Sequence, residues 1–475
     1  MVESKIGSVH FIGIGGVGMS GIARVAHDQG MRVSGSDIKE SRYTRALREA
    51  GVEVFIGHDA ANLGWGGVCP DVVVVSTAVL DENPELMAAR SRGIAVWHRA
   101  RMLAHLGVGL QTLAVAGTHG KTTTSSMLAS TLDDLGLDPT FLIGGTVCAY
   151  GTNAHSGTGA HYVVEADESD KSFTNLSPHA VLVTNVEADH LDHYRDLAEI
   201  EERFAAFIGL VPTDGVVVAC GDDPRLMKVA RASASRVVSY GFAPTCDVRI
   251  ESYEPQGITS RYTLRLADGR VLEGSLPQNP GRHNVSNAAG VVALVEALGL
   301  DAAQAVGSLT RFCGVKRRFD LVGQADGVTV VDDYAHHPTE IASTVSAAAE
   351  LGYRRVHVLF QPHRYSRISL FADVMRDEFA HAFDRADTVT FMDVYSAGET
   401  PVPGVNGRAF MNVVLESPDH PPAEFVPHRI DTVAALLAKV GEGDLLITMG
   451  AGDVTAMGPL VVEALRQRVE ERGAR

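Results

Sequence analysis

The chain has 475 residues, of which 45% are hydrophobic and 21% charged, a composition typical of globular proteins, and at roughly 100–200 residues per domain it is long enough for two to four domains. Its 58 acidic residues against 41 lysines and arginines give a net charge of −17, which disfavours a nucleic-acid partner because phosphate backbones attract basic surfaces. No apolar run approaches the roughly 18 residues of a membrane helix, the first residues do not resemble a signal peptide, and the five cysteines lack metal or disulfide spacing. We therefore expect a cytoplasmic protein with no membrane insertion.

Short apolar runs rich in β-branched residues alternate with segments rich in alanine and leucine along the whole chain. This alternation is typical of α/β proteins with parallel sheets. It restarts twice, so we predict three domains over residues 1–109, 110–320 and 321–475. The first should contain strands near residues 9–12, 32–34, 52–55 and 72–76.

A glycine loop follows the first predicted strand. Gly13, Gly15 and Gly18 form the pattern G-x-G-x-x-G before a predicted helix, and Asp37 closes the next strand. Such glycines let backbone N–H groups at a helix N-terminus approach a pyrophosphate, and the carboxylate can accept a hydrogen bond from a ribose hydroxyl. The motif alone does not distinguish NAD from another nucleotide diphosphate, and a tight turn that binds nothing is a third interpretation.

A second glycine loop, residues 116–124, follows a predicted strand at 113–116. It lacks the first glycine of the full Walker pattern but keeps Gly117, Gly120, Lys121 and Thr122. In such a loop, backbone N–H groups cradle phosphate oxygens, the lysine reaches the β- and γ-phosphates, and the threonine hydroxyl can bind Mg²⁺. A dehydrogenase has no use for this loop and a simple kinase has no use for the first one. An enzyme that uses ATP to activate a nucleotide-linked substrate needs both.

Two acidic segments, residues 165–170 and 184–190, follow predicted strands at 162–164 and 180–183. Because parallel strands end at the same edge of a sheet, we expect both segments near Lys121. Oxygen ligands are what Mg²⁺ prefers. For Asp167, Asp170 and Asp189 we expect only solvated loop charges.

The remaining segments complete the α/β pattern. Residues 249–272 alternate polar and apolar side chains around Asp268-Gly269, which predicts an antiparallel hairpin inserted in the second domain. The third domain should contain strands at 328–331, 356–360, 388–392 and 445–448.

Motifs along the whole chain resemble those of the Mur ligase family, at residues 13–21, 34–37, 81–84, 116–124, 165–170, 185–190, 281–284, 317–320, 332–340 and 361–367. The resemblance implies a Rossmann-like UDP-sugar-binding domain, a P-loop-type ATPase domain with an antiparallel β insertion, and a Rossmann-like C-terminal amino-acid-binding domain. It also implies ligation of L-alanine to the lactyl carboxylate of UDP-N-acetylmuramic acid through an acyl phosphate, in peptidoglycan precursor synthesis. A related recycling ligase that attaches a tripeptide to the same sugar is the alternative.

The resemblance also implies a role for individual residues. Lys121, His190 and Arg318 would be catalytic, and Thr122, Glu165 and His190 would bind metal. Tyr334, His336, Arg364 and Arg367 would face the muramoyl carboxylate and alanine. ATP would contact Gly117, Thr118, His119, Gly120, Lys121, Thr122, Thr123, His283, Asn284, Asn287, Arg318 and Asp333. The UDP-sugar would contact Gly15, Gly16, Val17, Gly18, Met19, Ser20, Ser36, Asp37 and Ser76. The implied cofactors are ATP and two Mg²⁺ ions, which Mn²⁺ can replace, and the implied state is a monomer or a weak homodimer.

Some of these residues have simpler interpretations. His337 can begin a helix without touching substrate. Arg364 and Arg367 are three residues apart on a predicted helical turn, so they face the same way and could form exposed salt bridges. As a whole, the chain could also be an NAD-dependent oxidoreductase or a UDP-sugar sensor without catalysis. The first leaves Lys121 unexplained, and the complete set of Lys121, Thr122, Glu165 and His190 argues against the second.

Overall fold

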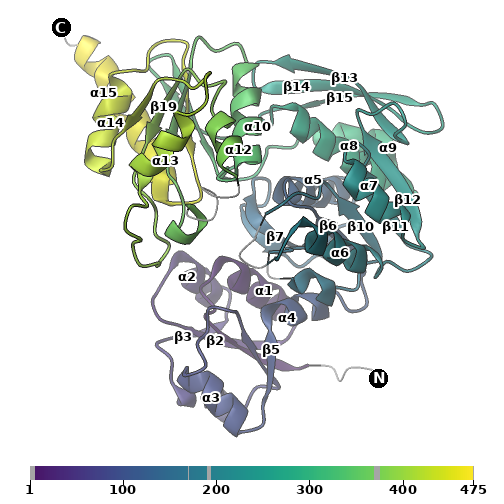
Figure 1. The fold of residues 1–475 in the computed structure, drawn as a ribbon. Coiled ribbons are helices and arrows are strands. Elements are labelled where there is room, and N and C mark those ends of the chain that lie inside the picture. The colour runs from purple at the N-terminus through teal and green to yellow at the C-terminus, as the bar shows by residue number, and fades with distance from the viewer. Residues whose placement is uncertain (1–5, 170, 190–193, 369–374, 474–475) are drawn as a thin grey trace. The chain divides into compact units, whose positions relative to one another are not determined.

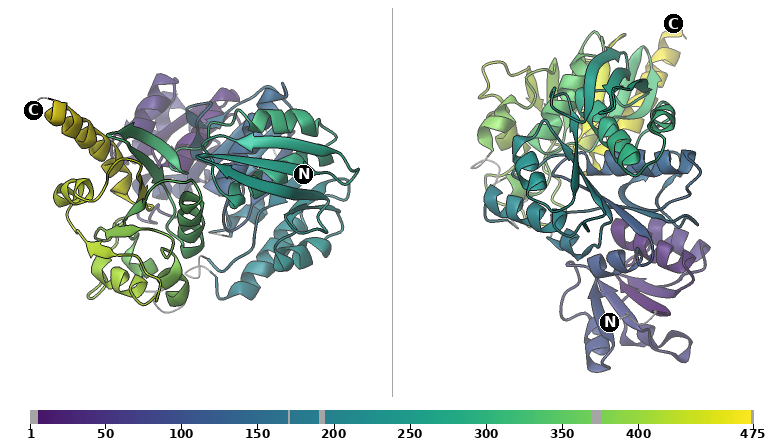
Figure 2. Two further views of the ribbon diagram at one scale, coloured as in Figure 1. Left: turned by 90° about the horizontal axis from the view of Figure 1, so that it is seen from above. Right: turned by 90° about the vertical axis from the view of Figure 1, so that its right-hand side faces the viewer.

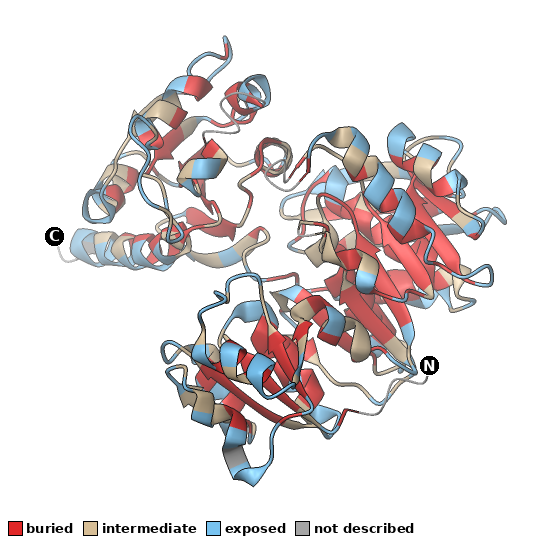
Figure 3. Ribbon diagram, turned by 60° about the horizontal axis from the view of Figure 1, so that its bottom comes forward, coloured by how far each residue is buried: buried red, intermediate tan, exposed pale blue. Residues whose placement is uncertain are grey.

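The computed structural model describes residues 6–169, 171–189, 194–368 and 375–473 (Figure 1). Contacts group the chain into two compact units. The first comprises Met1–Arg249, Arg265–Arg270 and Asn287–Ser308, and the second comprises Ile250–Leu264, Val271–Ser286 and Leu309–Arg475. Within the described ranges, no helix has both the length and the apolar character needed to span a bilayer. Buried residues concentrate on the strands of each sheet (Figure 3).

The first sheet has five parallel strands in the order β3-β2-β1-β4-β5. Strand β4 reads Val-Val-Val-Val, as expected where helices cover both faces of a parallel sheet. Leu63 and Leu86, from η1 and α3, cover one face, and α1 lies on the other (Figure 1). The strands are β1 Ser8–Ile12, β2 Arg32–Asp37, β3 Glu53–Ile56, β4 Val72–Val75 and β5 Ala95–His98, and the helices are α1 Val17–Asp28, α2 Arg42–Glu49, η1 Ala60–Gly67, α3 Pro84–Ser91 and α4 Arg99–His105.

The second sheet has the strand order β15-β14-β13-β12-β11-β10-β6-β9-β7-β8. At its centre β6 pairs in parallel with β10 on one side and β9 on the other. Its strands are β6 Gln111–Ala116, β7 Thr140–Val147, β8 Thr152–His155, β9 His161–Glu165, β10 Ala180–Val183, β11 Val216–Cys220, β12 Arg236–Gly241, β13 Val248–Gln256, β14 Thr259–Arg265 and β15 Val271–Leu276. Its helices are α5 Lys121–Asp134, η2 Ser172–Asn175, α6 Leu197–Ile208, α7 Pro224–Arg231, α8 Arg282–Ala297 and α9 Ala302–Leu309.

The predicted hairpin insertion is a run of three strands, β13 to β15, and so is larger than predicted. Only two residues join β13 to β14, which requires antiparallel neighbours. The predicted turn at Asp268-Gly269 lies between β14 and β15, where Gly269 has a φ of 89°.

The third sheet has the order β16-β17-β21-β18-β19-β20, and β16 is antiparallel to β17. Helix α15 packs along β16 and β17 beside α14 (Figure 2). The strands are β16 Asp320–Ala325, β17 Val328–Asp333, β18 Val356–Phe360, β19 Thr388–Phe391, β20 Ala423–Phe425 and β21 Leu445–Met449. The helices are α10 Pro338–Ala349, α12 Arg376–His381, α13 Gly407–Val414, α14 Arg429–Leu437, η3 Asp453–Ala456 and α15 Met457–Gly473.

The three sheets confirm the predicted three-part α/β fold class and every strand predicted from the sequence. The boundaries at residues 109 and 320 stay a prediction, because the two compact units divide the chain along other lines.

Candidate functional site

The first glycine loop forms a tight turn between β1 and α1. Gly13 has a φ of 79°, and its N–H and that of Ile14 both donate to the Ser36 carbonyl. The Asp37 carboxylate accepts from the Gly15 N–H at 2.9 Å. A Cβ on Gly15 would lie 2.8 Å from that carboxylate and 2.9 Å from Thr44 Cγ2, so a larger residue would require these side chains to shift. Asp37 therefore holds the loop, which is a role beyond the predicted ribose contact.

The N-terminus of α1 is open for an anion. Gly16 is its N-cap and supplies no side-chain cap, and the first turn contains no acidic residue. Residues 16–18 are exposed. Unpaired N–H groups and the helix dipole favour a phosphate at such an end. Met19 and Ser20 follow inside the helix and are buried, and Ser76 lies just after β4 on the same edge of the sheet.

Behind this loop, Glu85 is a completely buried carboxylate. It accepts hydrogen bonds from Ser36 Oγ and, at 2.5 Å, from Asn62 Nδ2. His58 Nδ1 lies 3.3 Å and His10 Nε2 3.7 Å from Glu85 Oε2. Burial by itself raises the pKa of Glu85, but His10, Ser36 and Asn62 outweigh it and lower the pKa. The ionised Glu85 carboxylate thus holds the side chain of Ser36, the candidate UDP contact, through a hydrogen bond.

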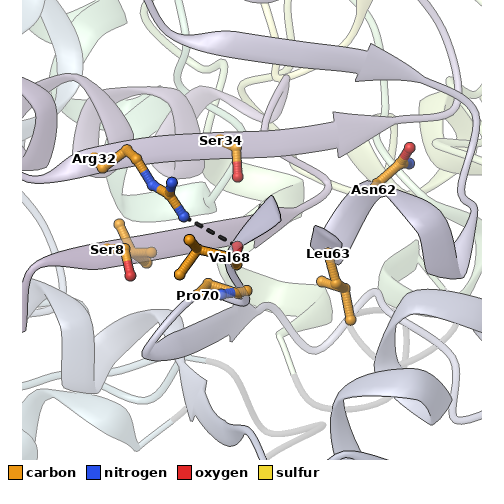
Figure 4. A pocket seen from close by; sticks show the side chains of 8 residues that line it. Ser8, Arg32, Ser34, Asn62, Leu63, Val68 and Pro70 are labelled. Atoms are coloured by element: carbon orange, nitrogen blue, oxygen red, sulfur yellow. Dashed lines mark hydrogen bonds between the residues drawn. The ribbon is translucent and has the colours of Figure 1, made fainter. Parts of the chain in front are cut away.

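A small pocket lies at the opposite end of this sheet, where β1 and β2 begin (Figure 4). Ser8, Ser34 and Val68 are among the residues lining it, and Arg32 Nη2 donates to the Val68 carbonyl at 3.0 Å. Ligands of parallel sheets bind at the carboxyl ends of the strands, and none of the predicted site residues lines this pocket.

The second glycine loop requires glycine at two positions. Gly117 has a φ of 133°, and a Cβ there would lie 2.0 Å from Thr184 Oγ1. Gly120, the N-cap of α5, has a φ of 84°, and a Cβ there would lie 2.9 Å from Asn287 Oδ1. Asn287, a predicted ATP contact, therefore lies against the loop.

The segment after β10 braces the same loop. Asn185 accepts from the His119 N–H at 2.8 Å through Oδ1 and donates to the His119 carbonyl at 3.1 Å. The Glu187 N–H donates to Thr118 Oγ1 at 2.8 Å. Thr123 begins the buried stretch of α5. These contacts hold the loop against the segment after β10, and residues 119–122 at the start of α5 stay partly accessible.

Lys121 is folded back onto its own loop. Its Nζ donates to the carbonyls of Gly117 at 2.7 Å and Thr118 at 3.0 Å, and to Glu168 Oε1 at 2.9 Å. Burial by itself lowers the pKa of Lys121, but the charges of Glu168, Asp167 and Glu165 outweigh it and raise the pKa. Burial raises the pKa of Glu168 to about 7, and the Lys121 charge opposes this only in part.

Thr122 and Glu165 are the predicted metal ligands that the structure describes, and they lie together. Thr122 Oγ1 donates to Glu165 Oε1 at 2.9 Å, and Glu165 Oε2 accepts from the Gly144 N–H at 2.6 Å. The third predicted ligand, His190, lies outside the described residues. Among the described residues, no three His, Cys, Asp or Glu side chains group closely enough to hold a metal. Mg²⁺ commonly binds through one or two protein oxygens together with substrate phosphates and water, and Thr122 with Glu165 fits that pattern.

The predicted residues of the second unit gather around Asp333, at the end of β17. The Asp333 carboxylate accepts from the N–H groups of Phe319 and Ala335, each at 2.8 Å. Burial raises the pKa of Asp333 to about 6, against the opposite effect of Arg318. Arg318 Nη1 lies 3.5 Å from Glu340 Oε1. His283 and Asn284 belong to the same unit, in the first turn of α8.

Four aromatic side chains continue from this cluster. Tyr334 packs edge-on against His336 at 5.3 Å between ring centroids, and His336 lies 6.1 Å from His363, which stacks on Tyr395. The Arg318 guanidinium lies 5.5 Å from the centre of the Tyr334 ring. Burial, followed by the charges of the two neighbouring arginines, lowers the pKa of His363 to about 4.

Arg364 and Arg367 follow His363 in the sequence. The prediction that both lie on one helical turn is wrong for Arg364. Residues 365–368 are helical, whereas Arg364 precedes them with a φ of 64°. Its N–H donates to the Tyr395 carbonyl at 2.9 Å, and this contact holds it outside the helix. Both side chains affect the pKa of His363 and so lie in the same neighbourhood.

His337 has the structural role considered as an alternative. It is the N-cap of α10, accepts from the Thr339 N–H, and forms a capping box with Glu340. Its side chain is almost completely buried.

Four residues of these clusters had no role in the sequence prediction: Glu85, Glu168, Glu340 and His363. Glu168, Glu340 and His363 belong to motifs identified in the sequence, and Glu85 directly follows the motif at residues 81–84. The signal for Glu168 was a further carboxylate three residues after Glu165. Sequence spacing placed these residues in the right loops. It did not indicate which carboxylate would reach Lys121.

Comparison with known proteins gives consistent matches along the chain. The model described as "Mur ligase family, catalytic domain" matches residues 8–108, "Mur ligase middle domain" matches 115–295, and "Mur ligase, glutamate ligase domain" matches 317–452. The UDP-N-acetylmuramate–L-alanine ligase of Thermobifida fusca is 46% identical over 97% of each chain. The crystal structure of a UDP-N-acetylmuramate-alanine ligase from Thermotoga maritima is 30% identical with a TM-score of 0.79, covering 97% of this chain and 99% of that one. A murein peptide ligase from Psychrobacter arcticus is 24% identical with a TM-score of 0.68, covering 97% and 98%, and shows the same fold.

Proposed function

The chain belongs to the Mur ligase family, and from this premise we propose that it uses ATP to join L-alanine to the lactyl carboxylate of UDP-N-acetylmuramic acid. The products are UDP-N-acetylmuramoyl-L-alanine, ADP and phosphate, in the cytoplasmic synthesis of peptidoglycan precursors. The observation that carries the proposal is the edge formed by β10, β6 and β9. There the Lys121 loop and Glu165 leave neighbouring parallel strands, as a site for ATP and a metal requires.

The first glycine loop holds the UDP diphosphate in this proposal. The open N-terminus of α1 supplies backbone N–H groups, and Ser36, Asp37 and Ser76 lie at the ends of β2 and β4 beside it. The first glycine loop contains no lysine like Lys121. We therefore assign the UDP-sugar to the first loop and ATP to the second. The segments 1–109, 110–320 and 321–475 would then bind UDP-sugar, ATP and amino acid.

The second glycine loop holds the ATP phosphates. Backbone N–H groups at the start of α5 contact them, Lys121 neutralises charge between the β- and γ-phosphates, and Asn287 limits the adenine side of the loop. Thr122 and Glu165, with His190, would hold Mg²⁺, which would neutralise charge on the phosphate oxygens when bound. We propose two ions, with Mn²⁺ as a possible replacement.

A carboxylate must be activated before an amine can attack it. One lactyl carboxylate oxygen attacks the γ-phosphorus in line, and the bond from that phosphorus to the ADP oxygen breaks. The neutral amine of alanine then attacks the acyl carbon and loses a proton, and inorganic phosphate leaves with the carboxylate oxygen. The step needs no serine or cysteine nucleophile. Arg318, paired with Glu340 and close to Asp333, supplies a fixed positive charge for transferred phosphate.

Alanine binding is assigned to the cluster of Tyr334, His336, Arg364 and Arg367. A guanidinium group can bind a planar carboxylate through two parallel hydrogen bonds. The positive φ of Arg364 keeps its backbone outside the following helix, and both arginine side chains lie close enough to His363 to lower its pKa. His363, whose pKa is lowered to about 4, is neutral at physiological pH and adds no further charge.

A coupled assay of phosphate release tests the proposal. Release should require ATP, UDP-N-acetylmuramate and L-alanine together, and omission of any one should abolish it. Phosphate release with a tripeptide in place of L-alanine at a higher kcat/KM would instead identify the recycling ligase. The relatives argue against that outcome, because the L-alanine ligase of Thermobifida fusca is 46% identical, whereas the murein peptide ligase supports the fold alone. Hydride transfer to or from NAD would identify the oxidoreductase alternative.

A further inference from the structure

Lys121 has three ammonium hydrogens, and three acceptors of the chain receive them. Two acceptors are carbonyls of its own loop. The third is the Glu168 carboxylate, whose two oxygens lie 2.9 Å and 2.8 Å from Nζ. A phosphate can therefore gain a hydrogen bond from Lys121 only by displacing one of these acceptors.

Glu168 cannot simply move aside, because its backbone is fixed. The Tyr194 hydroxyl donates to the Glu168 carbonyl at 2.6 Å, and the Lys171 N–H donates to the same oxygen at 2.9 Å. The Tyr194 side chain is itself buried. The Glu168 side chain is 3% exposed, which leaves it no route to solvent.

We propose that Glu168 is a positioning residue that competes with the nucleotide for Lys121, and so weakens nucleotide binding in order to allow ADP to leave. The inference rests on the proposed function of the loop as the ATP site. Without nucleotide, Lys121 is held inward by Glu168. When phosphates bind, Lys121 gives up at least part of that contact, and when ADP and phosphate depart, Glu168 takes the ammonium back. A binding state reached only after a competing contact is broken has a lower apparent affinity.

The competition predicts an effect opposite to that of an ordinary binding residue. Glu168→Gln keeps the size and one acceptor oxygen but removes the charge. The affinity for ADP should rise about fivefold, as expected when a charge-assisted hydrogen bond becomes a neutral one of similar geometry. The KM for ATP should fall in parallel, and inhibition by ADP should become stronger. Glu168→Asp, which is shorter by one methylene, should give a smaller change in the same direction.

Asp167→Asn is the matched control. It removes one negative charge from the same loop, but Asp167 is 44% exposed and lies 3.7 Å from Arg99, so water screens its charge more than that of the buried Glu168, and it gives Lys121 no hydrogen bond to lose. Its affinity for ADP should stay within about twofold of the parent, since exposed pairs contribute little. UDP-N-acetylmuramate affinity, unchanged in all three variants, shows that each chain is folded.

The experiment measures the Kd of ADP with Mg²⁺ by calorimetry, in a buffer alkaline enough to ionise Glu168. Tighter binding by Glu168→Gln and unchanged binding by Asp167→Asn are the expected results. Weaker or equal binding by Glu168→Gln would overturn the inference and would make Glu168 a support that holds Lys121 in place for phosphate. Absence of ADP binding to the parent chain would instead refute the proposed function. Should Glu168→Gln fail to fold, Glu168→Asp carries the same test.

Discussion

Substitution of Gly117 by alanine should disable the ATP loop while leaving the rest of the chain intact. The φ of 133° is strained for alanine by about 1–3 kcal/mol. The new methyl would lie 2.0 Å from Thr184 Oγ1 and 3.0 Å from the Thr184 nitrogen. Because part of this obstacle is backbone, the loop must shift by about 1 Å, and a misplacement of that size costs about 100-fold in rate. We expect kcat/KM for ATP to fall at least about 100-fold, which is about 2.7 kcal/mol.

Phosphate release at varied ATP concentration measures this loss, and calorimetry with UDP-N-acetylmuramate shows whether the first loop survives. Gly136→Ala is the control. Gly136 follows the same helix with a φ of 77°, and its Cβ would meet nothing within 4 Å, so the substitution carries backbone strain without a clash. It should lower stability by about 1 kcal/mol and leave kcat/KM unchanged. If Gly117→Ala keeps activity within threefold of the parent, or if it loses UDP-sugar affinity as well, the assignment of the two loops is wrong.

Three further predictions concern separate parts of the chain. Lys121→Ala should abolish phosphate release and spare UDP-N-acetylmuramate binding, as measured by calorimetry, and loss of both would contradict the loop assignment. Glu85→Ala should destabilise the chain by about 1–3 kcal/mol, because it leaves the buried hydrogen-bond donors of Ser36 and Asn62 without their acceptor. The pKa of Glu85 is lowered in the folded chain, so its stabilisation is present above the ordinary value of 4.5 and is lost as the pH falls through the folded value. The melting temperature should therefore fall more steeply with acid in the parent than in Glu85→Gln, and equal slopes would refute this. L-alanine should exceed glycine as substrate by a factor equivalent to about 1–3 kcal/mol, since the donors differ by one methyl group. An equal kcat/KM for glycine and L-alanine would exclude a pocket that fits the methyl group of alanine.

The fold class and the edge that holds the ATP site could be predicted because both depend on local patterns. Strand β4 of the first sheet and the central strands of the second are apolar runs, and a glycine loop marks the end of β1 and of β6. Once the strands are parallel, residues that follow them must share an edge, which brings Thr122 and Glu165 together. Strand β16 was missed because it is a half-exposed edge strand with an irregular register near Gly323, so it lacks a clear apolar period.

Side-chain pairing between loops could not be predicted in the same way. Glu165 ends β9 and Glu168 lies three residues later in the following loop, and the path of the chain there brings Glu168 to Lys121 and Glu165 to Thr122. The conformation of Arg364 depends on a hydrogen bond to Tyr395, which is distant in sequence. The pairing of Glu85 with Ser36 likewise joins residues 49 positions apart, and Glu85 lies just outside the motif at residues 81–84.

The central claim is that the lactyl carboxylate is phosphorylated by ATP and then captured by L-alanine. It is tested most directly with UDP-N-acetylmuramic acid carrying oxygen-18 in that carboxylate, followed by mass spectrometry of the phosphate and of the UDP-sugar product. The account predicts that each inorganic phosphate released from fully labelled substrate carries one labelled oxygen, and that the UDP-sugar product contains one alanine residue and keeps the other labelled oxygen. Unlabelled phosphate, or label found in AMP, would contradict it.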